Sequence, residues 1–438
     1  MRCCTMPENA KEASVRIIAR LRKMRGFGDD FMTLIECFTE AHIDNVAASL
    51  RLRPEKVIFV GDMEEMQKSI PRYEKVFMRR GLCLQVVMQD SRGMYFEALC
   101  RILNKIISEE DACTIDLTGG GEMVTMAIGA VIATLDAAKR KNVRVERFEC
   151  NHSVVVDCIN GNRILSDMAM QISVAELVSL HGGCIRTGAY QPPKDCESKE
   201  LDGLWKVIAE SPKDWNYAIM RLKEFESRSE SKMRISLPMR ILRQSVSDFE
   251  GKEQTVRSLL DKLHRNGVID DFSTRDKLEY TYRSDLLRYC TNKAGNVLEV
   301  KTLLEGRAAE ENGAPYFHDC QMSVSLDWDG VVNGPGDHSP ETRNEIDVVL
   351  MHGTTPLFIS CKNGDIEDEE LYKLNTVANR FGGPYAKKML IATNLDRKSP
   401  AANLAFSQRA KDMGITLVEE AAVLSGKKWE KRFKKEMQ

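Results

Sequence analysis

Residues 344–364, NEIDVVLMHGTTPLFISCKNG, decide how the C-terminal half of this chain folds. Two apolar runs, residues 348–350 and 357–359, flank a short segment that contains Gly353. Short loops with a glycine connect antiparallel strands, so this pattern predicts a β-hairpin. The expected centre of the turn lies between Gly353 and Thr354.

The predicted hairpin gathers four polar side chains on one surface. With the turn centred after Gly353, Asp347 lies opposite Ser360 and Glu345 lies opposite Lys362. Carboxylates are ligands for Mg²⁺ or Mn²⁺, and a nearby lysine can hold a phosphate or help to activate water. A solvated polar face on a half-buried hairpin would have the same pattern. The pattern alone leaves both interpretations open.

The hairpin resembles the core of the PD-(D/E)xK nucleases, in which an Asp is followed by a strand that ends in x-x-Lys. In that family an upstream helical Glu completes the site, and Glu299 in the run NVLE is the matching residue. The resemblance implies that Glu299, Glu345 and Asp347 hold Mg²⁺ or Mn²⁺, with Lys362 and Ser360 as further catalytic residues. The family motif has an acid where this sequence has Ser360. We therefore expect Glu345, or else one of two acids in the following helix, to supply the missing charge; these are Glu369 and Glu370.

Composition indicates a globular protein of two or three domains. The chain has 438 residues, 43% of them hydrophobic and 29% charged, with a net charge of −2. This charge does not by itself indicate a nucleic-acid partner, although a basic groove can be local. The 13 cysteines show no C-x₂-C spacing, which favours reduced thiols over disulfides or zinc. Without an apolar run of about 18 residues, the sequence predicts no membrane association and a cytoplasmic location.

The N-terminal half alternates apolar strands with amphipathic helices. After a polar, basic extension at residues 1–30, this alternation predicts a Rossmann-like domain at residues 31–185 with a parallel sheet. The expected strands are residues 32–38, 56–60, 82–88, 113–117 and 143–148, and the expected helices are residues 43–52, 63–80, 95–108 and 123–139.

Three consecutive glycines follow the predicted strand 113–117. In a doubly wound sheet, ligands bind outside the carboxyl ends of the strands, and a helix start offers free N–H groups to a phosphate. A strand-to-helix turn needs only one glycine, so three favour contact with a ligand. The sequence lacks G-x-G-x-x-G, so a nicotinamide cofactor is not expected. The candidate ligand-binding residues are Thr118, Gly119, Gly120, Gly121 and Glu122.

A strand that ends in D-L-T-G-G-G before a helix resembles the CARF domain of type III CRISPR accessory proteins. Together with the C-terminal motif, it makes the chain similar to the CRISPR ancillary nucleases with CARF and PD-(D/E)xK domains. The resemblance implies a homodimer that binds a cyclic oligoadenylate, usually the tetra-adenylate, at residues 118–122. It implies a role in antiviral defence through cleavage of single-stranded RNA or DNA and nicking of duplex DNA. Many CARF domains have a lysine near the glycines, whereas this chain has Glu122, so the ring size stays open.

Residues 186–284 are expected to form a linker and a winged-helix-like connector, and residues 285–438 the nuclease domain. A winged helix either binds nucleic acid or serves as a plain connector. The basic C-terminal helix fits either contact with a nucleic-acid backbone or an ordinary charged terminus. The alternative function is a ligand-responsive transcription regulator whose nuclease-like domain is inactive because of Ser360. A nuclease that degrades only the cyclic messenger is a third possibility.

Overall fold

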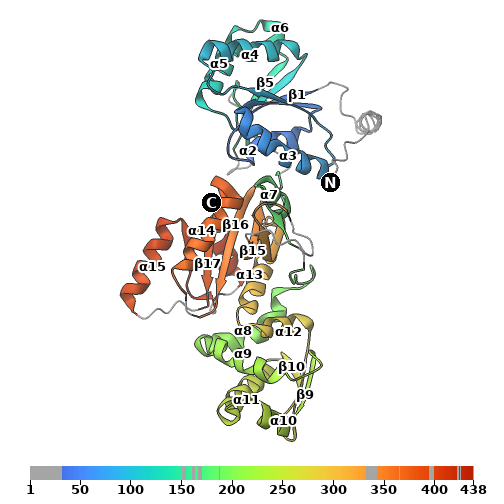
Figure 1. The fold of residues 1–438 in the computed structure, drawn as a ribbon, viewed down its shortest axis with the longest axis vertical. Coiled ribbons are helices and arrows are strands. Elements are labelled where there is room, and N and C mark those ends of the chain that lie inside the picture. Colours follow the sequence, from blue (N-terminus) through green and yellow to red (C-terminus); the bar gives the residue numbers. More distant parts are fainter. Residues whose placement is uncertain are drawn as a thin grey trace. The chain divides into compact units, whose positions relative to one another are not determined.

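The computed structural model describes residues 32–149, 154–159, 163–165, 170–186, 188–331, 343–364, 366–393, 399–421, 424 and 426–437 (Figure 1). The predicted extension at residues 1–30 lies outside the described residues. The chain forms two compact units, Met1–Ile172 with Ser179–Gly182, and Ser173–Val178 with Gly183–Gln438.

The N-terminal unit is built on a seven-stranded sheet with the order β3-β2-β1-β4-β5-β6-β7. The first five strands pair in parallel, and β6 and β7 add an antiparallel edge. This order, with its reversal between β1 and β4, is that of the doubly wound folds and confirms the predicted Rossmann-like domain. The strands are β1 (Thr33–Cys37), β2 (Lys56–Gly61), β3 (Gln85–Asp90), β4 (Cys113–Asp116), β5 (Val143–Glu149), β6 (Val154–Asp157) and β7 (Arg163–Leu165).

Helices connect the parallel strands, as the alternating pattern predicted. Asp62 caps α3, because its side chain accepts hydrogen bonds from the backbone N–H groups of Glu64 and Glu65. The helices are α2 (Asp44–Leu52), α3 (Met63–Arg79), α4 (Phe96–Glu109), α5 (Glu122–Thr134) and α6 (Ala137–Arg140). A further helix, α7 (Val174–Leu180), has residues in both units.

The second unit contains a six-stranded sheet with the order β18-β17-β16-β15-β14-β8. Strands β14, β15 and β16 are antiparallel, and β16, β17 and β18 are parallel. The strands are β8 (Cys184–Ile185), β14 (Asp319–Asp327), β15 (Arg343–His352), β16 (Thr355–Lys362), β17 (Lys387–Ala392) and β18 (Ile415–Val418). Residues 184–185 therefore pair within this sheet and not within the N-terminal one.

Around this sheet, the described residues of the second unit form five helices and several short elements. Side chains cap two helices, Ser284 before α12 and Ser399 before α15, where Pro400 occupies the first turn. The helices are α12 (Asp285–Asn292), α13 (Asn296–Ala308), α14 (Glu369–Gly382), α15 (Pro400–Asp412) and α16 (Gly426–Met437). The short elements are β12 (Glu310–Glu311), β13 (Ala314–Pro315) and η3 (Gly383–Tyr385).

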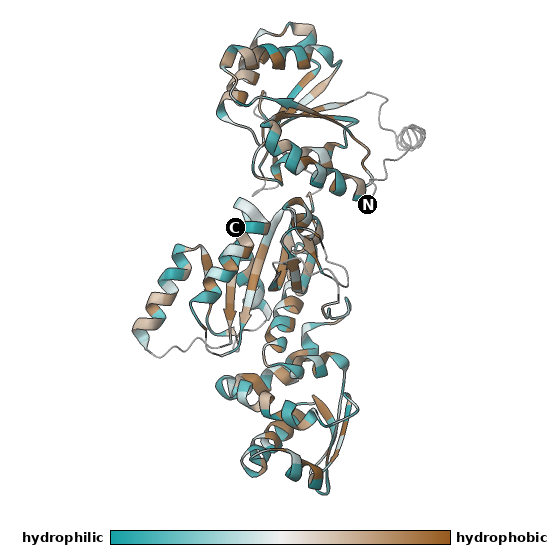
Figure 2. Ribbon diagram, in the orientation of Figure 1, coloured by the Kyte–Doolittle hydropathy of each residue, from teal (hydrophilic) through white to brown (hydrophobic). Residues whose placement is uncertain are grey.

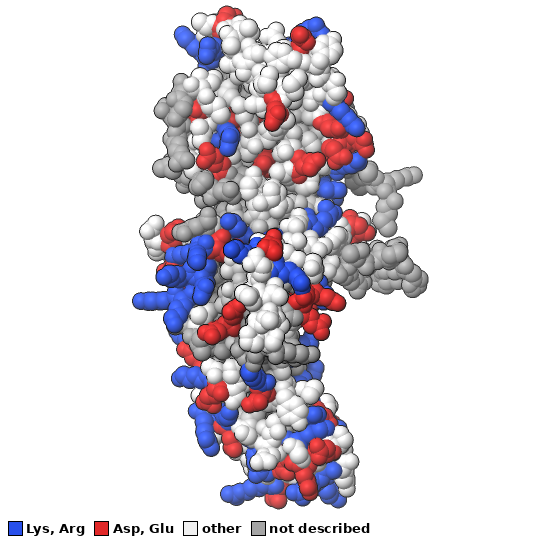
Figure 3. Space-filling model, turned by 90° about the vertical axis from the view of Figure 1, so that its left-hand side faces the viewer, with Lys and Arg blue, Asp and Glu red and all other residues white. Residues whose placement is uncertain are grey.

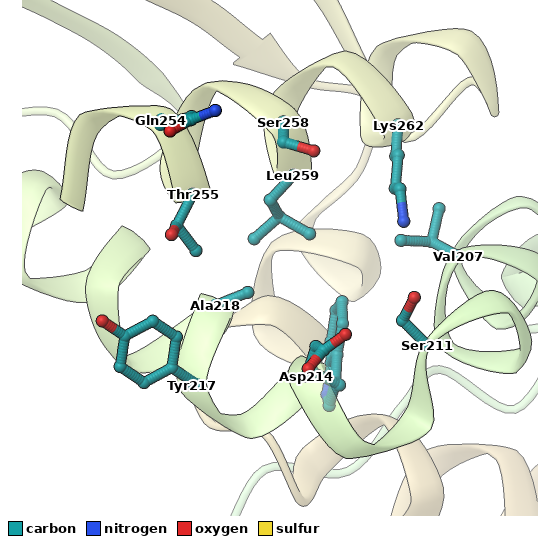
Figure 4. A pocket seen from close by; sticks show the side chains of 11 residues that line it. Val207, Ser211, Asp214, Tyr217, Ala218, Gln254, Thr255, Ser258, Leu259 and Lys262 are labelled. Carbon is teal, nitrogen blue, oxygen red and sulfur yellow. The ribbon is translucent and has the colours of Figure 1, made fainter. Parts of the chain in front are cut away.

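A winged-helix-like connector, as predicted, precedes the C-terminal sheet in the same unit. It has helices flanking a three-stranded sheet with the order β10-β11-β9. Its elements are η2 (Ser198–Leu201), α8 (Asp202–Glu210), α9 (Pro212–Glu226), β9 (Arg234–Pro238), α10 (Met239–Ser245), α11 (Phe249–Arg265), β10 (Ile269–Ser273) and β11 (Lys277–Tyr282). A cavity of about 450 Å³ is lined by residues of α8, α9 and α11 and by Ser211, which lies between α8 and α9. Lys262 and Ser258 lie on one side of it, and Asp214 and Tyr217 lie on the other (Figure 4).

One apolar core joins the connector to the C-terminal sheet. It includes Leu222 of α9, Leu260 of α11, Leu303 of α13 and Val348 of β15, all with no exposed surface. The strands β15, β16 and β17 are mostly hydrophobic, whereas helices α14 and α15 mix hydrophilic and hydrophobic residues (Figure 2). Burial of this shared apolar surface holds α9 beside the sheet that carries the predicted site.

Candidate active site

The hairpin has the predicted turn. His352 pairs with Thr355 across Gly353-Thr354, and the pairing continues to Val348 and Ile359. Gly353 has a φ of 61°, the left-handed conformation that a tight hairpin turn requires. The same register, extended by one residue on each strand, places Asp347 across from Ser360.

The Asp347 carboxylate is held by the opposite strand. Its Oδ2 accepts a hydrogen bond of 2.6 Å from the backbone N–H of Cys361 and one of 3.2 Å from the Ser360 hydroxyl. Burial raises the pKa of Asp347, and the Lys362 ammonium and these hydrogen bonds oppose the increase. Ser360 therefore orients the aspartate through its hydroxyl.

Lys362 lies between two carboxylates. Its Nζ is 3.9 Å from Asp347 Oδ2 and 2.9 Å from Glu370 Oε2. Glu370 also pairs with Lys373 at 3.1 Å. Of the two α14 acids that the sequence left open, Glu370 therefore faces the site, whereas the Glu369 side chain is 76% exposed and pairs only with Lys373 among the described residues.

Glu299 approaches the same carboxylates from the first turn of α13. Burial and then the negative charges of Asp347 and Glu345 raise its pKa to about 7, although Lys362 and Lys293 oppose the increase. Glu345 is exposed, and its charge raises the pKa of both other acids. The three predicted metal ligands therefore interact electrostatically. As the side chains stand, no three His, Cys, Asp or Glu residues within the described ranges are grouped closely enough to hold a metal ion.

A strained residue that sequence reasoning missed lies on the neighbouring strand. Ser323 has a φ of 48°, and it falls between the pairs Met322–Val348 and Val324–Ile346, opposite Asp347. Its hydroxyl lies 3.5 Å from Glu299 Oε2. A left-handed serine is uncommon, and such strain is concentrated at functional sites. A glycine would have revealed this conformation in the sequence, but a serine does not.

Because the pKa of Glu299 is raised, we expect the stability of the folded protein to depend on pH. Because the folded-state pKa of about 7 exceeds the ordinary 4.5, the folded protein binds an extra proton between these values. The stabilising effect of that proton is complete below pH 4.5 and is lost as the pH rises through 7. We expect Glu299→Gln to raise the melting temperature at pH 8 in metal-free buffer and to change it little at pH 5. Equal effects at the two pH values in thermal unfolding would contradict this.

Packing gives two of the three glycines in the glycine turn, residues 118–121 of the N-terminal unit, a structural reason of their own. A Cβ on Gly120, whose φ is 95°, would lie 2.5 Å from Cys37 Cβ, and one on Gly119 would lie 2.5 Å from the Cys37 carbonyl oxygen. These two glycines are required by close packing against the end of β1. Gly121 is exposed and has nothing within 4 Å of an added Cβ.

Thr118 has a structural role in this turn. Its hydroxyl donates to Asp116 Oδ1 at 2.6 Å and accepts from the backbone N–H of Phe148 at 2.8 Å. Glu122, the first residue of α5, is exposed. Of the five predicted ligand-binding residues, Gly121 and Glu122 therefore have the most open surroundings.

Comparison with known proteins identifies the C-terminal part. Residues 293–432 match the family model described as the Card1-like endonuclease domain. Among solved structures, the chain is similar to protein VC1899 from Vibrio cholerae, with 16% identity, a TM-score of 0.68, and coverage of 92% of this chain and 97% of the other. It is also similar to Can2 from Sulfobacillus thermosulfidooxidans in complex with cyclic tetra-adenylate, with 15% identity, a TM-score of 0.60, and coverage of 93% and 97%. No match was found among curated proteins.

The chain thus has a Rossmann-like domain and a C-terminal part that matches an endonuclease-domain model. The predicted resemblance to the CRISPR ancillary nucleases is thereby confirmed. None of the helices within the described ranges is long and apolar enough to cross a membrane.

Proposed function

We propose that this chain is a divalent-metal-dependent nuclease of type III CRISPR defence, activated by a cyclic oligoadenylate bound at the glycine turn. The observation that carries the proposal is the grouping of Glu299, Asp347 and Lys362 within the part that matches an endonuclease domain. The fold that this chain shares with Can2, a protein described in complex with cyclic tetra-adenylate, supports the tetra-adenylate as activator.

The carboxylates of Glu299, Asp347 and Glu345 would hold the cation, because hard oxygen ligands suit Mg²⁺ or Mn²⁺. Burial raises the pKa of Glu299 most, and the charges of Asp347 and Glu345 raise it further; a bound cation would offset this repulsion among the acids. The cation would supply charge neutralisation at the phosphate and activation of the attacking water. Asp347 Oδ2 is occupied by its hydrogen bonds, so Oδ1 is the atom left to bind.

Lys362 would stabilise the charge that develops on the phosphate. Glu370 sits beside it, already neutralised by Lys362 and Lys373, and its pKa is lowered by their hydrogen bonds, against the opposing effect of burial. Glu370 is therefore suited to orienting the lysine and less suited to binding the cation. Glu345 forms no ion pair among the described residues, which favours it as the third ligand in place of the acid missing at Ser360.

A two-fold dimer is part of the proposal. Helix α5, directly after the glycine turn, exposes 45% of Met123 and 59% of Met126, while Val124, Ala127 and Ile128 are buried. An exposed apolar helix face is suited to an isologous contact with a second copy. Such a dimer would present two glycine turns to one cyclic ligand.

The test is cleavage of labelled RNA and DNA strands with and without cyclic tetra-adenylate, in Mg²⁺, Mn²⁺ or EDTA, on protein whose mass is measured by light scattering. We expect a dimer and cleavage that requires both activator and metal. Degradation of the cyclic messenger with every strand left intact would refute the proposal. The RNA-to-DNA ratio from the same assay gives the substrate preference.

Gly121→Asp should weaken cyclic tetra-adenylate binding on the order of a hundredfold, because it places a negative charge beside the ligand phosphates. The fold should persist, since an added side chain meets nothing within 4 Å and an aspartate suits the start of α5. Calorimetry gives the affinity, and the neutral Gly121→Asn variant separates charge from size. Unchanged affinity in both variants would place the ligand elsewhere.

Basic side chains are available for a nucleic-acid backbone. Lys and Arg side chains gather over the C-terminal unit (Figure 3). Helix α16 buries Trp429, Phe433 and Met437. Its opposite face exposes Lys427, Lys428, Lys431, Arg432 and Lys435. This arrangement supports contact with phosphates through charge.

A further inference from the structure

The turn between α12 and α13 is held by residues from two other segments. The backbone carbonyl of Ala294 accepts a hydrogen bond of 3.0 Å from the indole N–H of Trp215 and one of 3.1 Å from the side-chain amide of Asn363. Trp215 belongs to α9 of the connector, and Asn363 directly follows Lys362. Two donors on one carbonyl fix the position of this turn relative to the active-site strand.

Asn363 is itself tied on its other sides. The side-chain amide of Asn216 donates to the Asn363 backbone carbonyl, and the Thr393 hydroxyl donates to Asn363 Oδ1. Asn363 thus connects α9, the end of β17 and the α12–α13 turn. The neighbouring Lys293 is consequently attached to a rigid frame that also positions Lys362.

Lys293 is exposed and has no salt-bridge partner among the residues that the structure describes. Lys362, by contrast, is engaged by Asp347 and Glu370. Lys293 is also close enough to the carboxylates for its charge to act on Glu299. Burial raises the pKa of Glu299, and Lys293 is one of the two lysines that oppose this increase. An uncommitted ammonium thus lies at the edge of an acidic site.

We propose that Lys293 binds a backbone phosphate of the substrate strand, next to the phosphate that is attacked. The inference rests on the proposed nuclease function and adds a residue that positions the strand. The carboxylates of Glu299, Glu345 and Asp347 repel a polyanion that enters the site, and Lys362 is already paired with Glu370 and Asp347. An ammonium on a fixed turn offsets this repulsion and sets where the strand lies.

The experiment measures binding of a labelled single strand to the full-length protein in EDTA, by fluorescence anisotropy at several salt concentrations. One phosphate contact contributes about 0.7 to the slope of log K against log salt for a single strand. We expect Lys293→Gln to lower the slope by about this amount and to weaken binding about tenfold at low salt, the value of one charge-assisted hydrogen bond. Lys293→Arg should keep the wild-type slope.

The matched control is Lys141→Gln, which removes an exposed lysine from the N-terminal unit and should leave both quantities unchanged. A slope and affinity for Lys293→Gln equal to the wild-type values would overturn the proposal, as would a wild type that binds no strand. A changed melting temperature without a changed slope would indicate a structural role and would also overturn it.

The result of the Lys293 experiment can be distinguished from the result of the test of the proposed nuclease function. If the wild type binds strands with a slope that depends on Lys293 but cleaves none in the presence of metal and activator, the nuclease function fails and the phosphate contact stands. If it cleaves strands and Lys293→Gln leaves the slope unchanged, the nuclease function stands and the contact fails.

Discussion

Asp347→Asn is expected to slow strand cleavage by roughly a thousandfold or more, because loss of a metal ligand removes several kcal/mol of transition-state stabilisation. The amide keeps the size of the side chain, and its oxygen can still accept from Cys361 N–H, so the hairpin should remain folded. The measurement is the single-turnover cleavage rate in the presence of activator, with circular dichroism as the check on folding.

Glu345→Gln in the same assay decides which acid replaces the one missing at Ser360. We expect a loss similar to that of Asp347→Asn, because Glu345 acts on the other two acids and lacks an ion pair among the described residues. Ser360→Ala should cost less than about tenfold, since the hydroxyl only orients Asp347. Glu369→Gln is the matched control and should leave the cleavage rate unchanged. A fully active Glu345→Gln together with an inactive Glu370→Gln would move the third ligand to α14.

Lys362→Met should also cost roughly a thousandfold in rate, because it removes the positive charge nearest to the attacked phosphate. Metal affinity should change little, since an ammonium is not a ligand, and calorimetry with Mn²⁺ measures it. Lys373→Met provides the control, because Lys373 contacts the same Glu370 from the exposed side of α14. A Lys362→Met variant that cleaves normally but loses Mn²⁺ affinity would contradict the assignment.

Much of the fold could be predicted because its signals lie in consecutive residues. The alternation of apolar strands and amphipathic helices predicted the doubly wound sheet, and Gly353 between two apolar runs predicted the hairpin and its register. The spacing of apolar residues and the residue preferences of turns depend on near neighbours in the chain, so both can be recognised in the sequence. The same alternation put Asp347 and Ser360 on one face, where the structure has them hydrogen-bonded.

Other features could not be predicted from local pattern. Gly119, Gly120 and Gly121 look equivalent in sequence, but only contact with Cys37 at the end of β1 shows that packing requires the first two. Glu369 and Glu370 are adjacent acids, and the orientation of α14 against the sheet decides that Glu370 meets Lys362. Ser323 carries a left-handed backbone without a glycine to signal it.

The sequence by itself determined the two kinds of domain, the hairpin and the acids and lysine that its strands carry. The tertiary structure alone decided which distant segments meet there, including Trp215 and Asn216 of the connector and the turn that holds Lys293. The physical reason is that the periodicity of strands and helices and the residue preferences of turns arise from interactions between residues that are close in the chain. Contact between segments far apart in the chain depends on how the apolar faces of α9, α13 and β15 pack into one shared core.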